Sequence, residues 1–161
     1  HRIESNLEIE YLHTTAEEIA HLRPSHYDIV TCLEMLEHVP NPAAIISACV
    51  TLVKPGGHIF FSTLNRNLKS YFFAIVGAEY ILKLLPKNTH DFAKFIKPSE
   101  SARKVRSVEI KISAIKGMHY KPLTRTASLC EDVSINYLLA CQTASHSVLD
   151  TADVHTLLDQ R

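Results

Sequence analysis

Apolar residues follow strand-like and helix-like spacing in turn through the first half of the chain. Residues Tyr27–Leu33 are continuously apolar after Asp28, as expected of a strand buried in a parallel sheet. Pro42–Leu52 has helical spacing, with Asn41 as its cap and a proline in the first turn. A Gly-Gly turn then precedes a second apolar strand over 58–63. This strand–helix–strand order predicts an α/β domain with a parallel, doubly wound sheet.

Weaker patterns flank this unit. Residues 7–12 alternate between apolar and charged side chains, which predicts a strand. The segment 14–18 has the character of a capping box and predicts a short helix to about Leu22. Further along, the pattern predicts a short helix after Pro98 and strands over 107–115 and 134–141. The last two strands resemble an antiparallel hairpin that closes the sheet.

A strongly apolar run covers residues 70–85. A membrane-spanning helix needs roughly 20 apolar residues, and this run is shorter and is interrupted by Glu79 and Lys83. Two alternatives stay open for it. The aromatic side chains and the flanking lysines suit a helix in a membrane interface, whereas a core helix or an active-site lid has the same composition.

Composition changes this picture only slightly. The 161 residues fit one domain, and the 17 basic and 17 acidic residues balance, so no bulk charge favours nucleic acid. The four cysteines show no Cys-x-x-Cys spacing and are interpreted as reduced thiols of a cytosolic or matrix-like compartment. The chain shows no signal peptide and begins at His1, which indicates a partial gene product, a processed chain or an engineered one.

The candidate chemistry lies after the first apolar strand. If the chain turns helical there, Glu34, Glu37 and His38 fall at positions i, i+3 and i+4 and share one face. Such a cluster can hold a divalent ion, with magnesium or manganese favoured by the carboxylates. Alternatively His38 acts as a general base, or the three residues form a solvated first helical turn. Asn65 and Arg66 follow the next strand, as substrate contacts or as part of a polar loop.

Several blocks together resemble the ubiquinone-biosynthesis O-methyltransferases. The blocks are Thr31-Cys-Leu-Glu-Met-Leu-Glu-His-Val-Pro40, Leu52-Val-Lys-Pro-Gly-Gly57, Phe60-Phe-Ser-Thr-Leu-Asn-Arg-Asn67, Val76-Gly-Ala-Glu-Tyr-Ile-Leu82, Thr89-His-Asp91 and Phe95-Ile-Lys-Pro98. The Glu-x-x-Glu-His-Val motif is common among methyltransferases, whereas the later blocks and their order are specific. The resemblance covers about residues 1–142.

The resemblance implies a Rossmann-like fold that uses S-adenosylmethionine to methylate phenolic hydroxyls of polyprenylated ubiquinone precursors. Carried over by position, Leu33 contacts the methyl donor, and Glu34, Glu37 and His38 match magnesium-binding positions, with His38 as the fallback catalytic base. Residues 70–97 match an insertion associated with membrane contact. The implied location is cytoplasmic and peripheral on the inner membrane, or on the matrix face of the mitochondrial one, within reach of a quinone-biosynthesis complex.

The chain also departs from the family pattern. The glycine-rich donor loop and the acidic residue for the donor ribose are absent, so the implied fold is partial, without its first strands. Residues 1–142 would form the C-terminal part of the methyltransferase domain, with 143–161 as a polar tail. We therefore expect the chain alone to be inactive. The alternative function is a non-catalytic, membrane-associated partner of a quinone-biosynthesis complex, or an inactive fragment.

Overall fold

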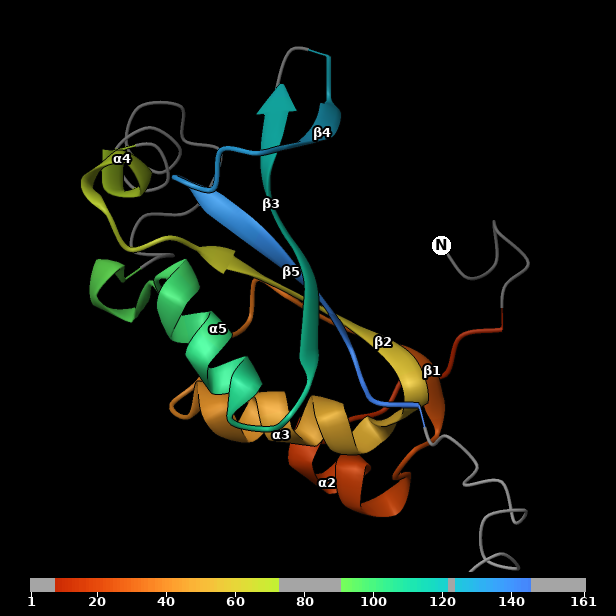
Figure 1. Cartoon of the computed structure of the whole chain (residues 1–161). Helices are drawn as coiled ribbons and strands as arrows, with labels where there is room; N and C mark the ends of the chain where they lie inside the picture. The colour runs from red at the N-terminus through yellow and green to blue at the C-terminus, as the bar shows by residue number, and fades with distance from the viewer. Residues whose placement is uncertain (1–7, 73–90, 122–123, 146–161) are drawn as a thin grey trace, which may run out of the picture.

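The computed structural model describes residues 8–72, 91–121 and 124–145, which form a five-stranded sheet with helices along one side (Figure 1). The strands are β1 (Tyr27–Leu33), β2 (Val53–Leu64), β3 (Lys111–Lys121), β4 (Thr126–Cys130) and β5 (Asn136–Gln142), in the order β1-β2-β5-β3-β4. Strands β1 and β2 are parallel, whereas β5 runs antiparallel to β2 and β3, and β4 runs antiparallel to β3. The sheet is therefore mixed, with its parallel pair at one edge.

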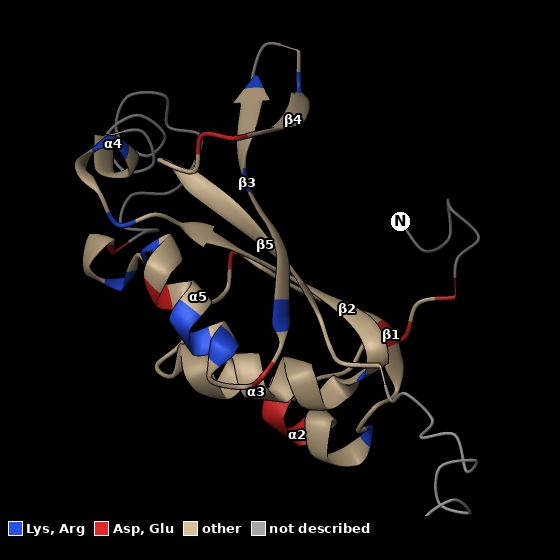
Figure 2. Cartoon of the chain, in the orientation of Figure 1, with Lys and Arg blue, Asp and Glu red and all other residues tan. Residues whose placement is uncertain are grey.

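The described helices are α2 (Ala16–Leu22), α3 (Pro42–Leu52), α4 (Leu68–Ser70), the 3-10 turn η2 (Phe92–Lys94) and α5 (Pro98–Arg106). Local sequence explains where they begin. Thr15 Oγ1 accepts from the Glu18 amide while the Glu18 carboxylate accepts from the Thr15 amide, which confirms the capping box. Asn41 caps α3 by accepting from the Ala44 amide. Basic residues gather on the last turns of α5, where the helix dipole favours their charge (Figure 2).

Two rows of side chains on β2 and β5 form the centre of the core. The row of β2 is Ile59, Phe61 and Thr63, and it pairs with Cys141, Leu139 and Tyr137 of β5; all six are almost fully buried. Successive strand residues point to opposite faces, and this row packs with buried residues of α3 and α5. We call this side of the sheet the core face.

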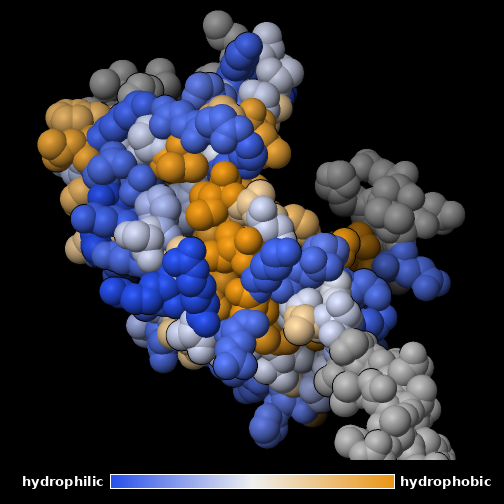
Figure 3. All heavy atoms as spheres, viewed as in Figure 1, coloured by the Kyte–Doolittle hydropathy of each residue, from blue (hydrophilic) through white to orange (hydrophobic). Residues whose placement is uncertain are grey.

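The alternate residues form the opposite face of the sheet. Its members on β1, β2 and β5 are Ile29, Thr31, Leu33, His58, Phe60, Ser62, Leu138 and Ala140. No described helix covers these residues, and Ile29 and Leu33 are 58% and 52% exposed. Apolar side chains also gather in a band over the middle of β3 and β5, bordered by the polar side chains of α5 (Figure 3). The described part of the chain thus leaves much apolar surface in contact with solvent.

Most of the predicted elements are confirmed. The strand over 27–33 and the helices ending at Leu22, over 42–52 and after Pro98 all occur, and the strands over 58–63 and 134–141 correspond to β2 and β5. The strand predicted over 107–115 begins only at Lys111, because residues 107–109 form a turn. The two strands predicted as the closing hairpin do pair antiparallel, as β3 and β5, but no single turn joins them: β3 turns into β4, which the pattern did not predict, and β5 lies between β2 and β3.

Two predictions about the strands need correction. Residues 8–12 form neither helix nor strand, because alternation makes a strand only where a neighbouring strand pairs with the backbone, and no described strand lies beside them. Strand β1 is parallel as predicted, but only Cys32 among its residues is buried. The reason is its position at the edge of the described sheet, where apolar side chains stay in solvent.

The predicted glycine turn lies inside β2 and not before it. Gly56 adopts a φ of 77°, which an L-residue rarely adopts. A Cβ at Gly57 would lie 2.7 Å from Val53 Cγ2 and 2.8 Å from the carbonyl oxygen of Asp28, so only glycine fits. The register accordingly jumps: Tyr27 pairs with Val53, but the next paired residues are Ile29 and His58. The two glycines let extra chain bulge out beside β1.

Two predicted segments lie largely outside the described residues. These are the apolar run 70–85, of which residues 73–85 are outside, and the tail 143–161, of which residues 146–161 are outside. In the described start of the apolar run, Phe72 is 59% exposed. Among the described residues, no helix is long and apolar enough to span a membrane.

The four cysteines are free thiols, as the sequence predicts, and they differ in burial. Cys32, Cys49 and Cys141 are buried, whereas Cys130 is half-buried on β4. The pKa of Cys49 is raised mainly by a hydrogen bond with Cys32 and to a smaller extent by burial. Burial raises the pKa of Cys141 to about 11.

We therefore expect one fast-reacting thiol in the native chain. Iodoacetamide at pH 8 should label Cys130 first, because alkylation needs an accessible thiolate. Mass spectrometry of the labelled peptides measures this, and full unfolding in urea should make all four thiols react. Rapid native labelling of Cys49 would contradict the described core.

Candidate functional site

The carboxyl ends of β1 and β2 lie side by side, with Leu33 paired to Ser62. In open α/β sheets, ligands bind where such parallel strands end. The loop after β1, residues 34–41, therefore occupies the candidate site. This loop is not helical: Glu34 has a φ of 50° and residues 36–38 form a turn, closed by the His38 amide donating to the Met35 carbonyl at 2.9 Å. The predicted helical spacing of the acidic cluster is thus wrong.

Two consecutive hydroxyls at the end of β2 bind the two acids of this loop. Ser62 Oγ donates to Glu34 Oε1 at 2.6 Å, and the Glu34 amide donates to the same hydroxyl at 3.0 Å. Thr63 Oγ1 donates to Glu37 Oε2 at 2.7 Å. Both carboxylates are therefore tied to the neighbouring strand, and neither acts as a solvated helix-end charge.

The three predicted site residues differ in exposure. Glu37 is only 3% exposed, and its Oε1 is fully buried with no hydrogen-bond partner in the structure. Glu34 and His38 are exposed. The arrangement therefore separates one buried acid from an exposed acid and an exposed imidazole.

This arrangement does not fit a shared metal ion. Within residues 8–72, 91–121 and 124–145, no group of three or more histidine, cysteine or acidic side chains is placed to hold one. Magnesium needs oxygen ligands at about 2.0–2.1 Å, whereas Glu34 and Glu37 each turn to a different hydroxyl. The cluster supplies no preformed octahedral site in this conformation.

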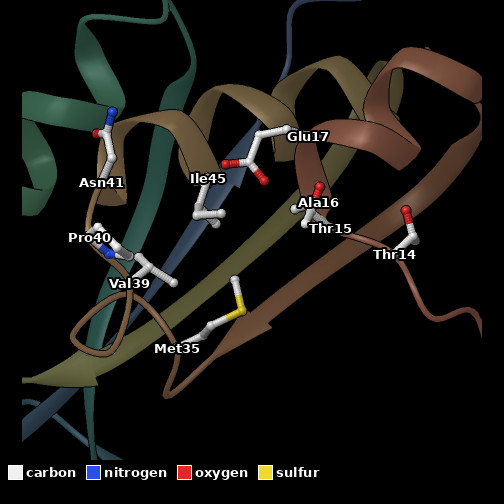
Figure 4. A pocket seen from close by; sticks show the side chains of 9 residues that line it. All are labelled: Thr14, Thr15, Ala16, Glu17, Met35, Val39, Pro40, Asn41 and Ile45. Atoms are coloured by element: carbon white, nitrogen blue, oxygen red, sulfur yellow. The ribbon is translucent and has the colours of Figure 1, made fainter.

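A cavity of about 430 Å³ lies beside the loop, between the start of α2 and the start of α3 (Figure 4). Its lining residues are Thr14, Thr15, Ala16, Glu17, Met35, Val39, Pro40, Asn41 and Ile45. The lining is mostly apolar with a few polar groups, as small-molecule sites usually are. The predicted donor contact, Leu33, is not among these residues; it lies on the opposite face at the end of β1.

Sequence reasoning did not identify this cavity. The sequence pattern places Thr15 in a helix-capping segment only, and it assigns no role to Met35 and Val39 of the loop after β1. The sequence does contain one signal for the cavity. Apolar residues that alternate with acids after the end of a strand can line a pocket, and Met35 and Val39 follow this pattern.

The segment after β2 is used within the chain. Asn65 Nδ2 donates to the Val133 carbonyl at 2.9 Å, and Asn67 Nδ2 donates to the Ser134 carbonyl at 2.6 Å. Arg66 forms an ion pair with Glu100 at the start of α5. Of the two alternatives for Asn65 and Arg66, the polar-loop interpretation is therefore the one that the contacts support.

Tyr137 lies on the core face, where it pairs with Thr63 of β2. Its hydroxyl donates to the Ile96 carbonyl at 2.9 Å and is hydrogen-bonded to Ser101 Oγ at 2.6 Å. Burial, with a smaller contribution from nearby acids that include Glu37, raises the pKa of Tyr137. Tyr137 therefore stays protonated and acts as a neutral anchor between β5 and α5, not as a base.

The chain is similar in sequence to known methyltransferases. Relatives called ubiquinone biosynthesis O-methyltransferase are 56% identical over 142 residues in Paraburkholderia phytofirmans and 57% identical over 145 residues in Burkholderia multivorans. These alignments cover 88% and 90% of this chain but only 61% and 62% of the relatives, so the chain spans about three fifths of their length.

Solved structures share the fold at low identity. A SAM-dependent methyltransferase from Thermotoga maritima matches with a TM-score of 0.59 and 16% identity, over 81% of this chain and 62% of that one. A SAM-dependent methyltransferase from Archaeoglobus fulgidus matches with a TM-score of 0.57 and 16% identity, over 82% and 66%. The family model described as a methyltransferase domain matches residues 4–119, well over half of the chain. The strand-end loop and its cavity agree with this fold. The family-model match over well more than half of the chain shows that the chain belongs to the methyltransferase-domain family.

Proposed function

We propose that the chain is part of an S-adenosylmethionine-dependent O-methyltransferase of ubiquinone biosynthesis. The observation that carries this proposal is the identity of 56–57% to relatives of that name over nearly nine tenths of the chain. The proposed substrates are phenolic hydroxyls of polyprenylated precursors, as the resemblance implies. The proposed donor pocket is the cavity lined by Ala16, Met35 and Val39, because it lies where β1 ends.

The chemistry asks little of the protein beyond positioning and proton removal. A phenol has a pKa near ~10, so it must lose or share its proton as the oxygen attacks the sulfonium methyl in line. His38 is exposed on the loop after β1 and is the proposed base. The donor contact implied for Leu33 stays a separate prediction, because Leu33 lies on the opposite face of the sheet and does not line the proposed pocket. Holding donor and acceptor together supplies much of the acceleration in such a reaction.

Magnesium stays a separate prediction within this proposal. In the described conformation Glu34 and Glu37 are committed to Ser62 and Thr63, so the proposed reaction assigns no step to a metal ion. If the intact enzyme nevertheless needs one, a chelator should lower methyl transfer, and added magnesium should restore it. Activity that is unaffected by chelator would refute the magnesium prediction and leave the donor proposal intact.

Donor binding tests the proposed function on the chain itself. Calorimetry with S-adenosylmethionine and S-adenosylhomocysteine should show weak binding, which Ala16→Phe should lower about tenfold or more by filling the cavity. Ala43→Phe is the matched control, since Ala43 is exposed on α3 and does not line the cavity. Equal effects of the two variants would contradict the assigned pocket. No binding to the native chain would favour the non-catalytic partner or inactive fragment instead.

Membrane contact through residues 70–97 is part of the same proposal. Phe72, at the described start of this segment, and Leu68, just before it, are exposed apolar side chains. Each contributes about 1.5–3 kcal/mol when fully buried in an apolar phase. We expect Leu68→Ser with Phe72→Ser to lower co-sedimentation with phospholipid vesicles several-fold. Leu129→Ser removes a similarly exposed side chain on β4 and should change little. Unchanged partitioning of the double variant would favour a lid or core helix.

A further inference from the structure

We propose that Glu37 is a positioning residue that fixes the loop after β1 from inside the core, and that it never shares a metal ion with Glu34. The inference deepens the proposed function, because this loop forms one wall of the assigned donor pocket. It rests on the hydrogen bonds, burial and strand register of the described residues. Its test needs no methyl transfer, so it can fail or succeed independently of the proposed reaction.

The two acids lie on opposite sides of the sheet. Consecutive residues of a strand point to opposite faces, and Ser62 and Thr63 are consecutive in β2. Thr63 pairs with Tyr137 on the core face, whereas Ser62 pairs with Leu138 and Leu33 on the opposite face. The carboxylates follow their hydroxyl donors, so Glu37 lies on the core face and Glu34 on the opposite face.

This division excludes a common ion. Two carboxylates that coordinate one magnesium or manganese ion must bring their oxygens within roughly 2–2.2 Å of it, yet the backbone of β2 separates these two. Glu37 is also out of reach from solvent, since its Oε1 has essentially no accessible surface and its Oε2 accepts from Thr63. Only Glu34 and His38 remain exposed enough to meet a dissolved ion.

Glu37 anchors the part of the loop that lines the cavity. Its neighbour Leu36 is also buried, so residues 36–37 anchor the loop in the core. Met35 and Val39 lie on either side of these two residues, and both line the cavity. The bond from Thr63 Oγ1 to Glu37 therefore fixes the position of two pocket side chains without touching a ligand.

A double-mutant cycle tests the positioning role. Thr63→Val removes the hydroxyl at constant shape and leaves a buried carboxylate unpaired, so the unfolding equilibrium constant should rise about tenfold to a hundredfold. Adding Glu37→Leu should recover part of that loss, because no buried polar group of Glu37 then remains unpaired. Thr63→Ser keeps the donor and should behave nearly as the native chain. Additive effects of Thr63→Val and Glu37→Leu would overturn the proposal.

Two further readouts separate this role from general stability. In Thr63→Val, amide hydrogen exchange in the loop 34–41 should accelerate at least tenfold more than exchange in β5; uniform acceleration would count against the inference. Manganese alone is the probe for the metal, followed by electron paramagnetic resonance of the full chain. Glu37→Gln should leave manganese binding as it is in the native chain. A one-to-one site that is lost in both Glu34→Gln and Glu37→Gln would overturn the separation of the two acids.

Discussion

Truncating Phe61 to alanine is expected to destabilise the chain strongly. Phe61 is fully buried in β2, between Cys32 of β1 and Leu139 of β5. Replacing a buried phenylalanine by alanine costs about 3–5 kcal/mol, because the lost transfer free energy adds to the cost of a cavity. The total stability of a domain is only ~5–15 kcal/mol, so the variant should be largely unfolded at modest urea concentration.

Urea denaturation followed by circular dichroism measures this effect. Leu129→Ala is the matched control, since Leu129 is 65% exposed on β4 and its truncation should change the free energy of unfolding by less than about 0.5 kcal/mol. Similar shifts in the two variants would mean that the packing of β2 against β5 is not the centre of the core.

A lysine at Ile29 is expected to suppress self-association of the chain. Ile29 is exposed on β1, which lies at the edge of the described sheet and carries apolar side chains, and such edges template pairing with other chains. The formal net charge of zero at pH 7 gives no repulsion between molecules. We expect the native chain to form oligomers at high concentration and Ile29→Lys to shift the population strongly towards monomer.

The control separates the edge from the charge. Leu12→Lys adds the same charge at an exposed apolar residue that belongs to no strand. Light scattering after size exclusion should show a clear fall in mean mass for Ile29→Lys and little for Leu12→Lys. Equal falls would assign the association to net charge, and a monomeric native chain at all concentrations would contradict the prediction.

The sequence predicts those elements whose signal is local. The capping box at Thr15, the Asn41 cap and the apolar run of β1 each specify their element through neighbours in the chain. Residues 8–12 and β4 depend instead on whether another strand lies alongside, which no local pattern records. The same limit explains β1, since its composition predicts burial and its position at the edge of the described sheet prevents it.

The candidate site shows the limit more sharply. The sequence correctly placed the acidic cluster at the end of β1, because chain order and the parallel sheet dictate it. Which way each acid turns depends on Ser62 and Thr63, nearly 30 residues further along the chain, with sequence separations of 28 and 26. Helical spacing of Glu34, Glu37 and His38 requires helical backbone from the first of them, and the positive φ of Glu34 breaks it there.

The paired hydroxyls of β2 have a consequence for folding fidelity. A parallel strand that slips by one residue exchanges its two faces. Such a slip of β2 past β1 would carry the Thr63 hydroxyl away from Glu37 and leave that acid buried without any donor. The misaligned sheet would thus lose a buried hydrogen bond and leave a buried carboxyl group without a donor at the same time. The hydrogen bonds of Ser62 and Thr63 to the two acids therefore form together only in the native register of β2 against β1, and they disfavour a slipped register.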